Sequence, residues 1–470
     1  MQTSPICRTL RGRVAEMTTT LVYGLAISGQ AVARELAARG DSLILADDSI
    51  DGSAIESHRS LATEIGAEFF SSPNEKQLRE IINKVDRVAP APGIPEVHQV
   101  VTLSHQQNKI LLSEIEIAYA IEQSTPSPRP MVAITGTDGK TTTTLMASAI
   151  ASAAGLKSMA VGNTEVPLIA ALGSDAQMFA VECSSFRLEY TQSFRAVASV
   201  WLNFAPDHLD WHTSLNSYRA AKAKIWAHLK PTDVAVVPVE NSEIEKFAQA
   251  SSARVVSFGA QRGDYHARNG VLTSPHGPIM KVSQMRRSLP HDVTNALAAC
   301  AITIEAGLAT PADAANALSE FVNAPHRIEL VASNDGVSWY NDSKATSPHA
   351  SRVALQSFDS IVLIAGGKNK GLELDEMACE PARMRAVVAI GNAAREIETA
   401  FSKICEVRRA DSMRDAVAIA NTLAKSGDAI LLSPGCTSYD WYSNYGQRGD
   451  DFSNEVRTLL AKLKTSGARS

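Results

Sequence analysis

The chain lacks the marks of several protein classes. Its six cysteines are scattered without a C-x-x-C pair, which argues against a zinc site or a disulfide framework and fits a reducing compartment. No stretch approaches the roughly 18 to 20 uninterrupted apolar residues that a membrane span needs. Basic charge is not in excess, because the net charge is −5 and the pI is about 6.2. We therefore expect a cytoplasmic monomer that binds neither nucleic acid nor membrane.

Signals for export and for repetition are also missing. Residues 1–20 hold no apolar run of signal-peptide length, and Met17 would serve as a second initiator. The sequence has no internal repeat of about 20 to 50 residues and no low-complexity tail, which argues against a solenoid. What remains is a composition of 45% hydrophobic and 20% charged residues, typical of a globular protein with well-filled cores.

At 470 residues the chain is too long for one ordinary domain. Strands alternate with helices along it, which predicts parallel sheets and an α/β class; the clearest strands of the last third are 361–365, 386–390 and 429–433. A proline-rich stretch at 124–130 and the P-H-R block at 325–327 mark boundaries. We therefore expect three domains: a Rossmann-like domain over 1–120, a central P-loop domain over 121–324 and a Rossmann-like domain over 325–470.

Residues 131–154 form a strand-turn-helix pattern that suits a triphosphate. Two glycines, Gly136 and Gly139, let backbone N–H groups converge on an anion at a helix N-terminus. Lys140 can reach the terminal phosphates, and the Thr141 hydroxyl can bind Mg²⁺. The match to the general P-loop is imperfect, because Ile134 stands where that loop has glycine. A chance glycine-rich turn is the alternative interpretation.

A second glycine-rich turn follows the first strand, at residues 24–29. It reads G-x-A-x-x-G, so Ala26 replaces the glycine that permits close approach of a pyrophosphate. Asp47 ends the next strand, where NAD enzymes bind a ribose hydroxyl. Three interpretations stay open: a structural turn, a nucleotide-diphosphate site and an NAD site.

A carboxylate and an imidazole lie at or after the ends of two strands in the central part of the chain. Glu182 ends a strand, a position suited to a second acidic contact for Mg²⁺, although a solvated or ion-paired glutamate is the plain alternative. His208 lies beside Asp207 in a dense polar loop. It is either a metal ligand or a buried histidine held by a carboxylate.

One lysine falls on an apolar helical stripe. Leu215, Tyr218, Lys222, Ile225 and Leu229 step by three and four residues, which is one face of an amphipathic helix. A lysine in that stripe must extend to solvent, meet a carboxylate or lose its charge. A chemically modified lysine facing a metal is the most specific of these hypotheses.

Three polar loops follow strands in the last third of the chain, at residues 340–346, 364–371 and 432–441. They combine an acid, lysines, hydroxyls and glycines. Because the carboxyl ends of parallel strands meet at one edge of a sheet, three such loops predict a ligand site rather than chance.

Taken in order, these blocks resemble the Mur ligases, from about Leu21 to the end of the chain. The blocks shared with the family at large, and in part with folylpolyglutamate synthases, are T-G-T-D-G-K-T (135–141), N-F-A-P-D-H-L-D (203–210), Y-R-A-A-K (218–222), P-H-R (325–327) and G-G-K-N-K (366–370). E-C-S-S-F-R-L-E (182–189), N-D-S-K-A-T (341–346) and S-P-G-C-T-S-Y-D (433–440) are similar to the branch that adds D-glutamate.

The resemblance implies a chemistry. ATP phosphorylates a carboxylate of UDP-N-acetylmuramoyl-L-alanine, and the amine of D-glutamate attacks the acyl phosphate, in peptidoglycan precursor synthesis. It implies two Mg²⁺ sites, one at Thr141 and Glu182 and one at His208, the second supported by a carbamate on Lys222.

It also implies functional groups throughout the chain. The catalytic set would be Lys140, Glu182, His208, Lys222 and Lys344. ATP would be bound by Gly136, Thr137, Asp138, Gly139, Lys140, Thr141, Thr142, Asp292, Asn295, Arg327 and Asp342. The UDP-substrate would be bound by Ile27, Ser28, Asp47, Asp48, Gly93 and Asn163, and D-glutamate by Thr346, Lys370, Ser438 and Tyr445.

Four positions depart from the family pattern. Asp138 and Asp292 stand where Asn is usual, Ser347 replaces an Asn, and Tyr445 stands where Phe is commoner. A carboxylate beside phosphates is unfavourable unless it points away or is paired. None of these changes removes a catalytic group.

Other functions remain as alternatives. The runner-up is a sibling ligase with another amino acid, such as L-glutamate, followed by a folylpolyglutamate synthase-like ligase. An NAD-dependent oxidoreductase fused to a P-loop domain is disfavoured by Ala26. A non-catalytic binding protein is disfavoured by the intact Lys140, Glu182, His208 and Lys222.

Overall fold

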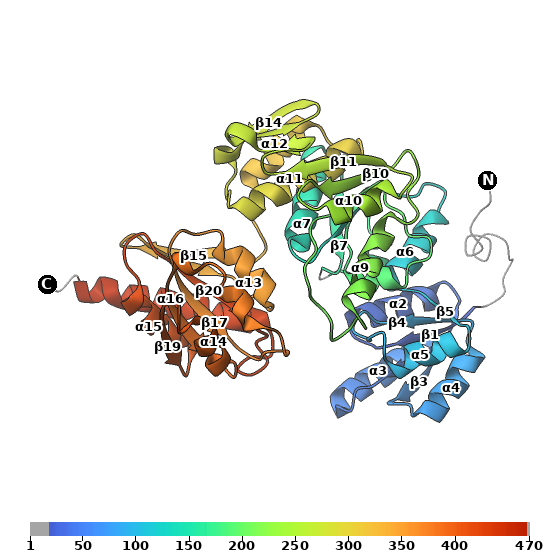
Figure 1. Cartoon of the computed structure of the whole chain (residues 1–470). Coiled ribbons are helices and arrows are strands. Elements are labelled where there is room, and N and C mark those ends of the chain that lie inside the picture. The colour runs from blue at the N-terminus through green and yellow to red at the C-terminus, as the bar shows by residue number, and fades with distance from the viewer. Residues whose placement is uncertain (1–17, 165, 468–470) are drawn as a thin grey trace. The chain divides into compact units, whose positions relative to one another are not determined.

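The computed structural model describes residues 18–164 and 166–467, so Met17 lies outside it. It contains three sheets in which parallel pairs predominate, each flanked by helices (Figure 1). The predicted α/β class is therefore confirmed. The chain divides into two compact units, one of residues up to 288 with 292–321 and one of 289–291 with 322–470. The domain boundaries at residues 120 and 324 stay predictions.

The N-terminal sheet has the strand order β3-β2-β1-β4-β5, and its pairs are all parallel. Its strands alternate between two apolar clusters, with Val22 on one face and Leu21 and Tyr23 on the other. The order reverses beside β1, and folds of this type bind ligands outside the carboxyl end of the strand at such a reversal, the position called here the crevice beside β1. The elements are β1 (Thr19–Tyr23), α2 (Ile27–Ala38), β2 (Ser42–Asp47), α3 (Gly52–Ile65), β3 (Glu68–Ser71), α4 (Glu75–Lys84), β4 (Arg87–Pro90), α5 (Gln99–Gln106) and β5 (Ile110–Leu111).

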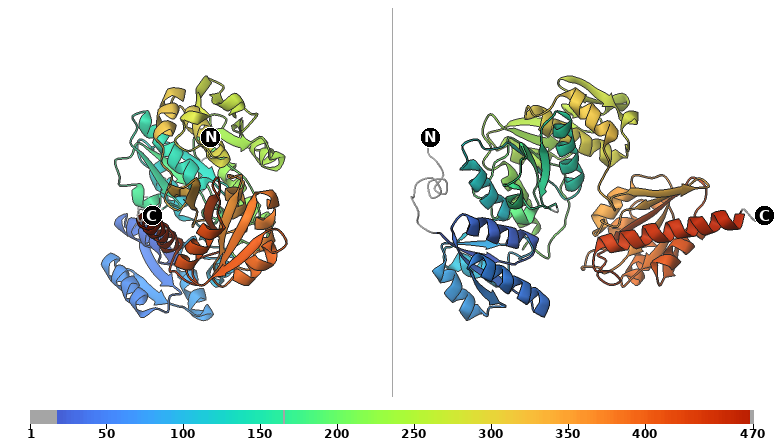
Figure 2. Two further views of the ribbon diagram at one scale, coloured as in Figure 1. Left: turned by 90° about the vertical axis from the view of Figure 1, so that its left-hand side faces the viewer. Right: turned by 180° about the vertical axis from the view of Figure 1, so that it is seen from behind.

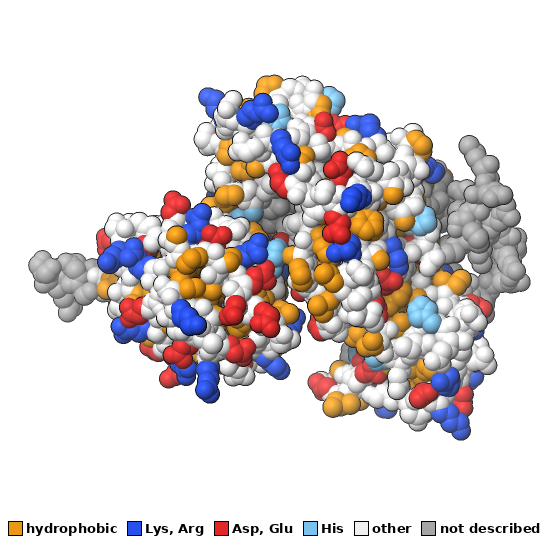
Figure 3. Space-filling model, in the orientation of Figure 1, with side chains coloured by type: hydrophobic (Ala, Val, Ile, Leu, Met, Phe, Trp, Pro, Cys, Tyr) orange, Lys and Arg blue, Asp and Glu red, His pale blue; other side chains and the backbone are white. Residues whose placement is uncertain are grey.

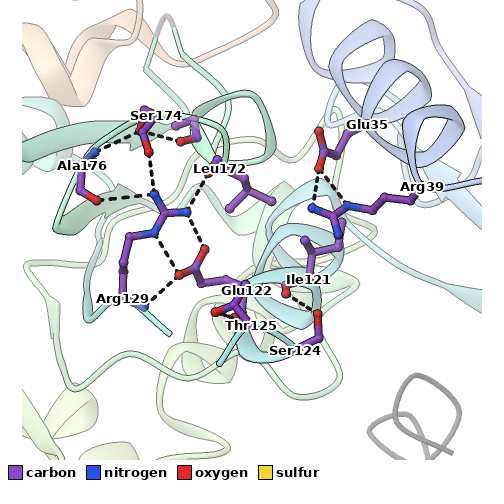
Figure 4. Close-up of polar contacts among 11 residues, drawn as sticks. Glu35, Arg39, Ile121, Glu122, Ser124, Thr125, Arg129, Leu172, Ser174 and Ala176 are labelled. Atoms are coloured by element: carbon purple, nitrogen blue, oxygen red, sulfur yellow. Dashed lines mark hydrogen bonds and ion pairs between the residues drawn. The ribbon is translucent and has the colours of Figure 1, made fainter. Parts of the chain in front are cut away.

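The proline-rich stretch after α6 (Glu114–Gln123) is tied down (Figure 4). Arg129 donates from its backbone N and its Nε to Oε1 of Glu122, at 2.8 and 2.9 Å, and from Nη2 to Oε2 at 2.6 Å. The same guanidinium also donates to the carbonyls of Leu172 and Ser174, at 2.8 and 3.1 Å. One apolar cluster includes α6 together with parts of the N-terminal and central sheets. Residues 121–130 therefore form a braced connection rather than a loose linker.

The central sheet has nine strands in the order β14-β13-β12-β11-β10-β9-β6-β8-β7. Strands β6 to β12 pair in parallel, and an antiparallel hairpin of β13 and β14 extends one edge. The hairpin was not predicted. The strands are β6 (Met131–Thr135), β7 (Ser158–Gly162), β8 (Met178–Glu182), β9 (Ala198–Trp201), β10 (Val234–Pro238), β11 (Arg254–Gly259), β12 (Tyr265–His266), β13 (Val271–Ser274) and β14 (Gly277–Lys281). The helices are α7 (Lys140–Ala153), α8 (Ser185–Glu189), α9 (Leu215–Ala223), α10 (Ser242–Gln249), α11 (Pro290–Glu305) and α12 (Pro311–Glu320), with short 3₁₀ turns η1 (Ile169–Ala171), η2 (Lys224–Trp226), η3 (Arg268–Gly270) and η4 (Val282–Gln284).

The C-terminal sheet has the order β15-β16-β20-β17-β18-β19, with only β15 antiparallel to its neighbour. Alternate residues of β17 enter two apolar clusters, so both faces are covered. The elements are β15 (Glu329–Asn334), β16 (Val337–Asn341), α13 (Pro348–Leu355), β17 (Ile361–Gly366), η5 (Leu374–Ala378), η6 (Pro381–Arg383), β18 (Met384–Ile390), α14 (Ala394–Phe401), β19 (Glu406–Ala410), α15 (Met413–Leu423), β20 (Ala429–Gly435) and α16 (Tyr445–Gly467), the long helix of this unit in Figure 2.

Acidic and basic side chains are interspersed over the visible face of the C-terminal unit (Figure 3). Among the described helices, none combines the length and the apolar character needed to cross a bilayer.

Candidate active site

The P-loop lies between β6 and α7. Gly139 has φ +80°, and a Cβ built on it would lie 2.5 Å from Oδ1 of Asn295, so the turn needs glycine for its conformation and for the close approach of α11. Nζ of Lys140 donates to the carbonyls of Gly136 and Thr137, at 2.9 and 2.7 Å. The predicted strand-turn-helix is present, with its lysine folded back over its own loop.

Asn203 braces this loop from the end of β9, and its role was not predicted. Its Oδ1 accepts from the backbone N of Thr137 and of Asp138, at 3.0 and 2.9 Å, and its Nδ2 donates to the Asp138 carbonyl at 3.1 Å. Strands β6 and β9 are parallel neighbours, with Thr135 opposite Trp201, so the loops that follow them meet. The position of Asn203 directly after a strand was the only sequence signal for this contact.

Lys222 is fully buried in α9, as its place in the apolar stripe predicts. Its Nζ donates to the Gly136 carbonyl at 2.6 Å and lies 4.6 Å from the centre of the Tyr218 ring. Within the described residues it forms no ion pair with a carboxylate, and 1% exposure excludes extension to solvent. Burial, and then the charge of Lys140, hold the pKa of Lys222 well below its usual value.

Glu182 and His208 offer ligand atoms for a cation. Oε1 of Glu182 accepts from Nδ2 of Asn163 at 3.2 Å, whereas the buried Oε2 has no hydrogen-bond partner among the described residues. His208, at φ +55°, has Nε2 3.3 Å from Oδ2 of Asp207, and burial lowers the pKa of the imidazole to about 4. A neutral imidazole and an unpaired carboxylate oxygen both suit a divalent cation.

A cation here would still need ligands of other kinds. Within the part of the chain that the structure describes, no three His, Cys, Asp or Glu side chains converge as a metal site would require. The remaining ligands would be the Thr141 hydroxyl, phosphate oxygens, water or a modified Lys222. This set fits Mg²⁺, which keeps several waters and binds substrate phosphates.

At the crevice beside β1, two predicted nucleotide ligands hold the turn itself. Asp47 accepts from the backbone N of Leu25 and of Ser49, at 2.6 and 2.7 Å. Asp48 accepts from the Tyr23 hydroxyl at 2.6 Å and lies 3.0 Å from Nε2 of His98. Nearby, Ile27 is 70% exposed and Gly93 has nothing within 4 Å of a built Cβ, so both are open to a ligand.

Arg187, also missed from the sequence, links the central domain to this crevice. It comes from α8, is buried, and forms an ion pair with Glu114. Its Nη2 donates to Oγ of Ser28 at 2.9 Å, at the start of α2. The N-terminus of α2 thus has a buried cation beside it.

The replacement at Asp292 has a structural explanation. Arg287 donates from Nε and Nη2 to the two carboxylate oxygens of Asp292, at 2.7 and 2.6 Å, and Asp292 is buried. The usual asparagine would carry no charge here, and the bidentate arginine neutralises the charge that the aspartate adds. Asn295, one turn later on α11, is buried against the P-loop.

The C-terminal unit gathers a second set of predicted groups. Nζ of Lys344 donates to the Tyr445 hydroxyl at 2.9 Å and lies 4.7 Å from the centre of its ring. Asp342 accepts from Oγ of Ser433 at 2.7 Å and from the backbone N of Ile328 at 3.3 Å. Other predicted groups differ in exposure: Ser438 is buried, Arg327 and Thr346 are half-buried and Lys370 is exposed.

The predicted residues thus fall into two sets. The first unit brings together the P-loop, Lys222, His208 and Glu182, together with the crevice beside β1. The second unit brings together Lys344, Tyr445, Asp342 and Ser438.

Comparison with known proteins places the chain in a family. Residues 134–303 match the model of the Mur ligase middle domain, and residues 326–436 match that of the Mur ligase glutamate ligase domain. A protein of Frankia casuarinae named UDP-N-acetylmuramoylalanine–D-glutamate ligase is 35% identical over 456 residues, which cover 93% of each chain. Proteins of the same name from Geotalea uraniireducens and Legionella pneumophila are 34% and 33% identical, cover 93% of this chain and are themselves covered to 97% and 99%.

Solved structures share the fold. The UDP-N-acetylmuramate–alanine ligase MurC of Thermotoga maritima has a TM-score of 0.56 at 17% identity, over 96% of this chain and 100% of that one. The MurF ligase of the same organism, in complex with ADP, has a TM-score of 0.56 at 14% identity, over 95% and 96% of the two chains. With its relatives matched along almost the whole length and both family models in order, this chain belongs to the Mur ligase family.

Proposed function

We propose that this chain is an ATP-dependent ligase that joins D-glutamate to UDP-N-acetylmuramoyl-L-alanine in peptidoglycan precursor synthesis. The observation that carries the proposal is the 35% identity, over 93% of both chains, to a ligase of that name. The site supports it, because a P-loop, a buried lysine and an unpaired carboxylate oxygen meet in one unit.

ATP would be held by the P-loop and by α11. Gly136 to Thr142 would place backbone N–H groups and the N-terminus of α7 on the phosphates, and Lys140 would turn from its own loop toward them. Thr141 and Glu182 would hold one Mg²⁺, which neutralises phosphate charge during phosphoryl transfer. Asn295 and Asp292 would lie at the adenine, with Arg287 balancing the charge of Asp292.

Lys222 would carry a carbamate. A lysine amine whose pKa is well below its usual value is neutral for a larger fraction of time and can attack CO₂. An N–C bond forms, the amine loses a proton, and the side chain becomes an anion. That anion would offset the charge of Lys140 and, with His208, would support the second Mg²⁺.

The substrates would occupy the two remaining sites. The crevice beside β1 would bind the uridine nucleotide through Ile27, Ser28, Asp47, Asp48 and Gly93, with Asn163 nearer the diphosphate and the muramoyl part. On the C-terminal unit, Thr346, Lys370, Ser438 and Tyr445 would bind D-glutamate. Arg327 and Lys344 would stabilise the γ-phosphate and the acyl phosphate, and Asp342 would bind the ribose of ATP. A monomeric state and a cytoplasmic location stay predictions.

The activity is tested by phosphate release. Purified protein with ATP, Mg²⁺ and UDP-N-acetylmuramoyl-L-alanine is offered D-glutamate, L-glutamate and other amino acids separately. We expect release with D-glutamate only. Release with L-glutamate instead would support the runner-up, a sibling ligase, and release with none would reject the proposal.

The carbamate is tested by Lys222→Ala, with Lys230→Ala, an exposed lysine, as the control. We expect Lys222→Ala to lose activity by about a thousandfold or more, because an electrostatic group at the phosphoryl transfer is removed. Short carboxylates such as formate should restore part of it, and the control should keep wild-type activity. Full activity of Lys222→Ala would show that the lysine serves packing alone.

A further inference from the structure

A buried arginine lies beneath the three polar loops of the C-terminal unit. Arg448, in the first turn of α16, is 1% exposed and is among the largest fully buried side chains. No motif of the sequence pointed to it. Its surroundings connect the loops that follow β16, β17 and β20.

The guanidinium binds two of these loops directly. Nε donates to Oγ of Ser343 at 3.0 Å, and Nη2 donates to the Ser343 carbonyl at 2.8 Å. Nη1 donates to the Cys436 carbonyl at 3.1 Å. Ser343 Oγ in turn donates to the carbonyl of Tyr445 at 2.7 Å, which fixes the start of α16.

The third loop, which follows β17, packs against the same guanidinium. A Cβ built on Gly367, at φ +129°, would lie 3.0 Å from Nη1 of Arg448. The next residue, Lys368, exchanges backbone hydrogen bonds of 2.8 and 3.1 Å with Thr437, which follows Cys436. Residues proposed to bind D-glutamate or the acyl phosphate, namely Lys344, Thr346, Lys370, Ser438 and Tyr445, all lie on these loops or beside Arg448 on α16.

Within the described residues, Arg448 has no direct acidic partner. Each acceptor of its hydrogen bonds is a neutral hydroxyl or carbonyl, and among the described residues no carboxylate forms an ion pair with it. Asp440 and Asp342 act on it from beyond ion-pair distance and offset its charge in part. Buried charges in proteins are normally paired, so a buried cation with neutral partners leaves positive potential over the loops above it.

We propose that Arg448 is a positioning residue for the amino-acid substrate. Its planar fork sets the three loops in register, and its charge, which no ion pair neutralises, favours an amino acid with two carboxylates over one with a neutral side chain. The inference rests on the proposed function, since it places D-glutamate at these loops.

The test compares Arg448→Met, which removes the charge, with Arg448→Lys, which keeps the charge but not the fork. The control is Arg457→Met, an exposed arginine on the same helix. For Arg448→Met we expect the KM for D-glutamate to rise at least about 30-fold while the KM for ATP stays within about threefold, and for Arg448→Lys a rise of about tenfold. The control should match the wild type in both constants.

Each outcome separates the two proposals. Wild-type protein that releases no phosphate with D-glutamate fails the proposed function, whatever the variants do. If the wild type is active and the KM for D-glutamate is unchanged in Arg448→Met or Arg448→Lys, the role of Arg448 is overturned and the proposed function stands. A lower kcat together with a similar rise in the KM of every substrate, and with a lowered Tm, would show that Arg448 only supports the fold. That result would also overturn the proposed role of Arg448. If Arg448→Met does not fold, Arg448→Lys decides by the same criterion.

Discussion

Two lysines of the P-loop region share one acceptor. Nζ of Lys140 and of Lys222 both donate to the Gly136 carbonyl, at 2.9 and 2.6 Å. The complete burial of Lys222, and then the charge of Lys140, disfavour a positive charge on Lys222, so its pKa lies well below the usual value. The carbamate proposed for Lys222 needs a neutral amine, which this lowered pKa favours.

The narrowest steric constraint in the loop is at Gly139. We expect Gly139→Ala to destabilise the protein by more than about 1 kcal/mol and to raise the KM for ATP, because the new methyl would meet Oδ1 of Asn295 at 2.5 Å. The control is Gly155→Ala, where φ is +86°, close to the +80° of Gly139, and nothing lies within 4 Å. The control measures backbone strain alone. Equal losses of Tm and unchanged KM for ATP in the two variants would contradict the contact with Asn295.

Single residues differed in how far the sequence revealed them. Helical periodicity predicted that Lys222 lies in an apolar stripe, and the apolar run before Glu182 predicted its place at the end of a strand, because both signals are local; the roles of the two residues stay predictions. Asn203 and Arg448 contact residues 65 and 105 positions away, and only the sheet topology brings those partners together. Their side chains carry no pattern that distinguishes them from ordinary polar residues.

At the scale of elements, the loop between β9 and α9 is anchored on the N-terminal domain. Nε1 of Trp211 donates to the carbonyl of Pro92 at 2.9 Å, and Glu96 accepts from the backbone N of Thr213 at 3.0 Å. His212 completes the anchor, with Nδ1 2.6 Å from Oε1 of Glu96 and Nε2 2.9 Å from Oγ of Ser185. The loop that carries His208 is thus positioned by a domain to which it does not belong.

His212 should make the stability of this anchor depend on pH. Burial lowers its pKa below the usual 6.5, against the opposing effect of Glu96. As pH falls through about 6.5, the unfolded chain binds a proton that the folded chain does not, so the free energy of unfolding falls by up to about 1.4 kcal/mol per pH unit. We expect His212→Gln to flatten the decline of Tm between pH 7 and pH 5. The exposed His228→Gln is the control, and a decline as steep in His212→Gln as in that control would contradict the prediction.

Strands with an uninterrupted apolar run were predictable from the sequence, and strands with an interrupted one were not. The strands expected at 361–365, 386–390 and 429–433 are β17, β18 and β20, each one or two residues longer than expected. The edge hairpin of β13 and β14 escaped prediction because its strands, V-L-T-S and G-P-I-M-K, hold no more than two aliphatic residues in a row and include a glycine and a proline. The composition of the proline-rich stretch predicts a boundary but gives no sign of the ion pair of Arg129 with Glu122 that braces it.

At the scale of the whole molecule, the proposed ATP groups lie on both compact units. Lys140 and Thr141 belong to the first unit, and Arg327 and Asp342 belong to the second. Phosphoryl transfer needs reacting groups within about 3 to 3.5 Å, so both units must contribute at the same time. Closure around the substrates is therefore expected to occur between these two units rather than at the braced residues 121–130.

Small-angle scattering checks this expectation. We expect a non-hydrolysable ATP analogue with UDP-N-acetylmuramoyl-L-alanine to reduce the radius of gyration, because ligand contacts made by both units favour a closed arrangement. The matched control is Lys140→Met, which should lose much of the phosphate contact and therefore the change. A further variant, Glu122→Gln, weakens the ion pair with Arg129 and so tests residues 121–130 separately from the junction of the two units. If the compaction vanishes in Glu122→Gln but persists in Lys140→Met, the motion occurs at residues 121–130, and the assignment of closure to the junction of the two units is wrong.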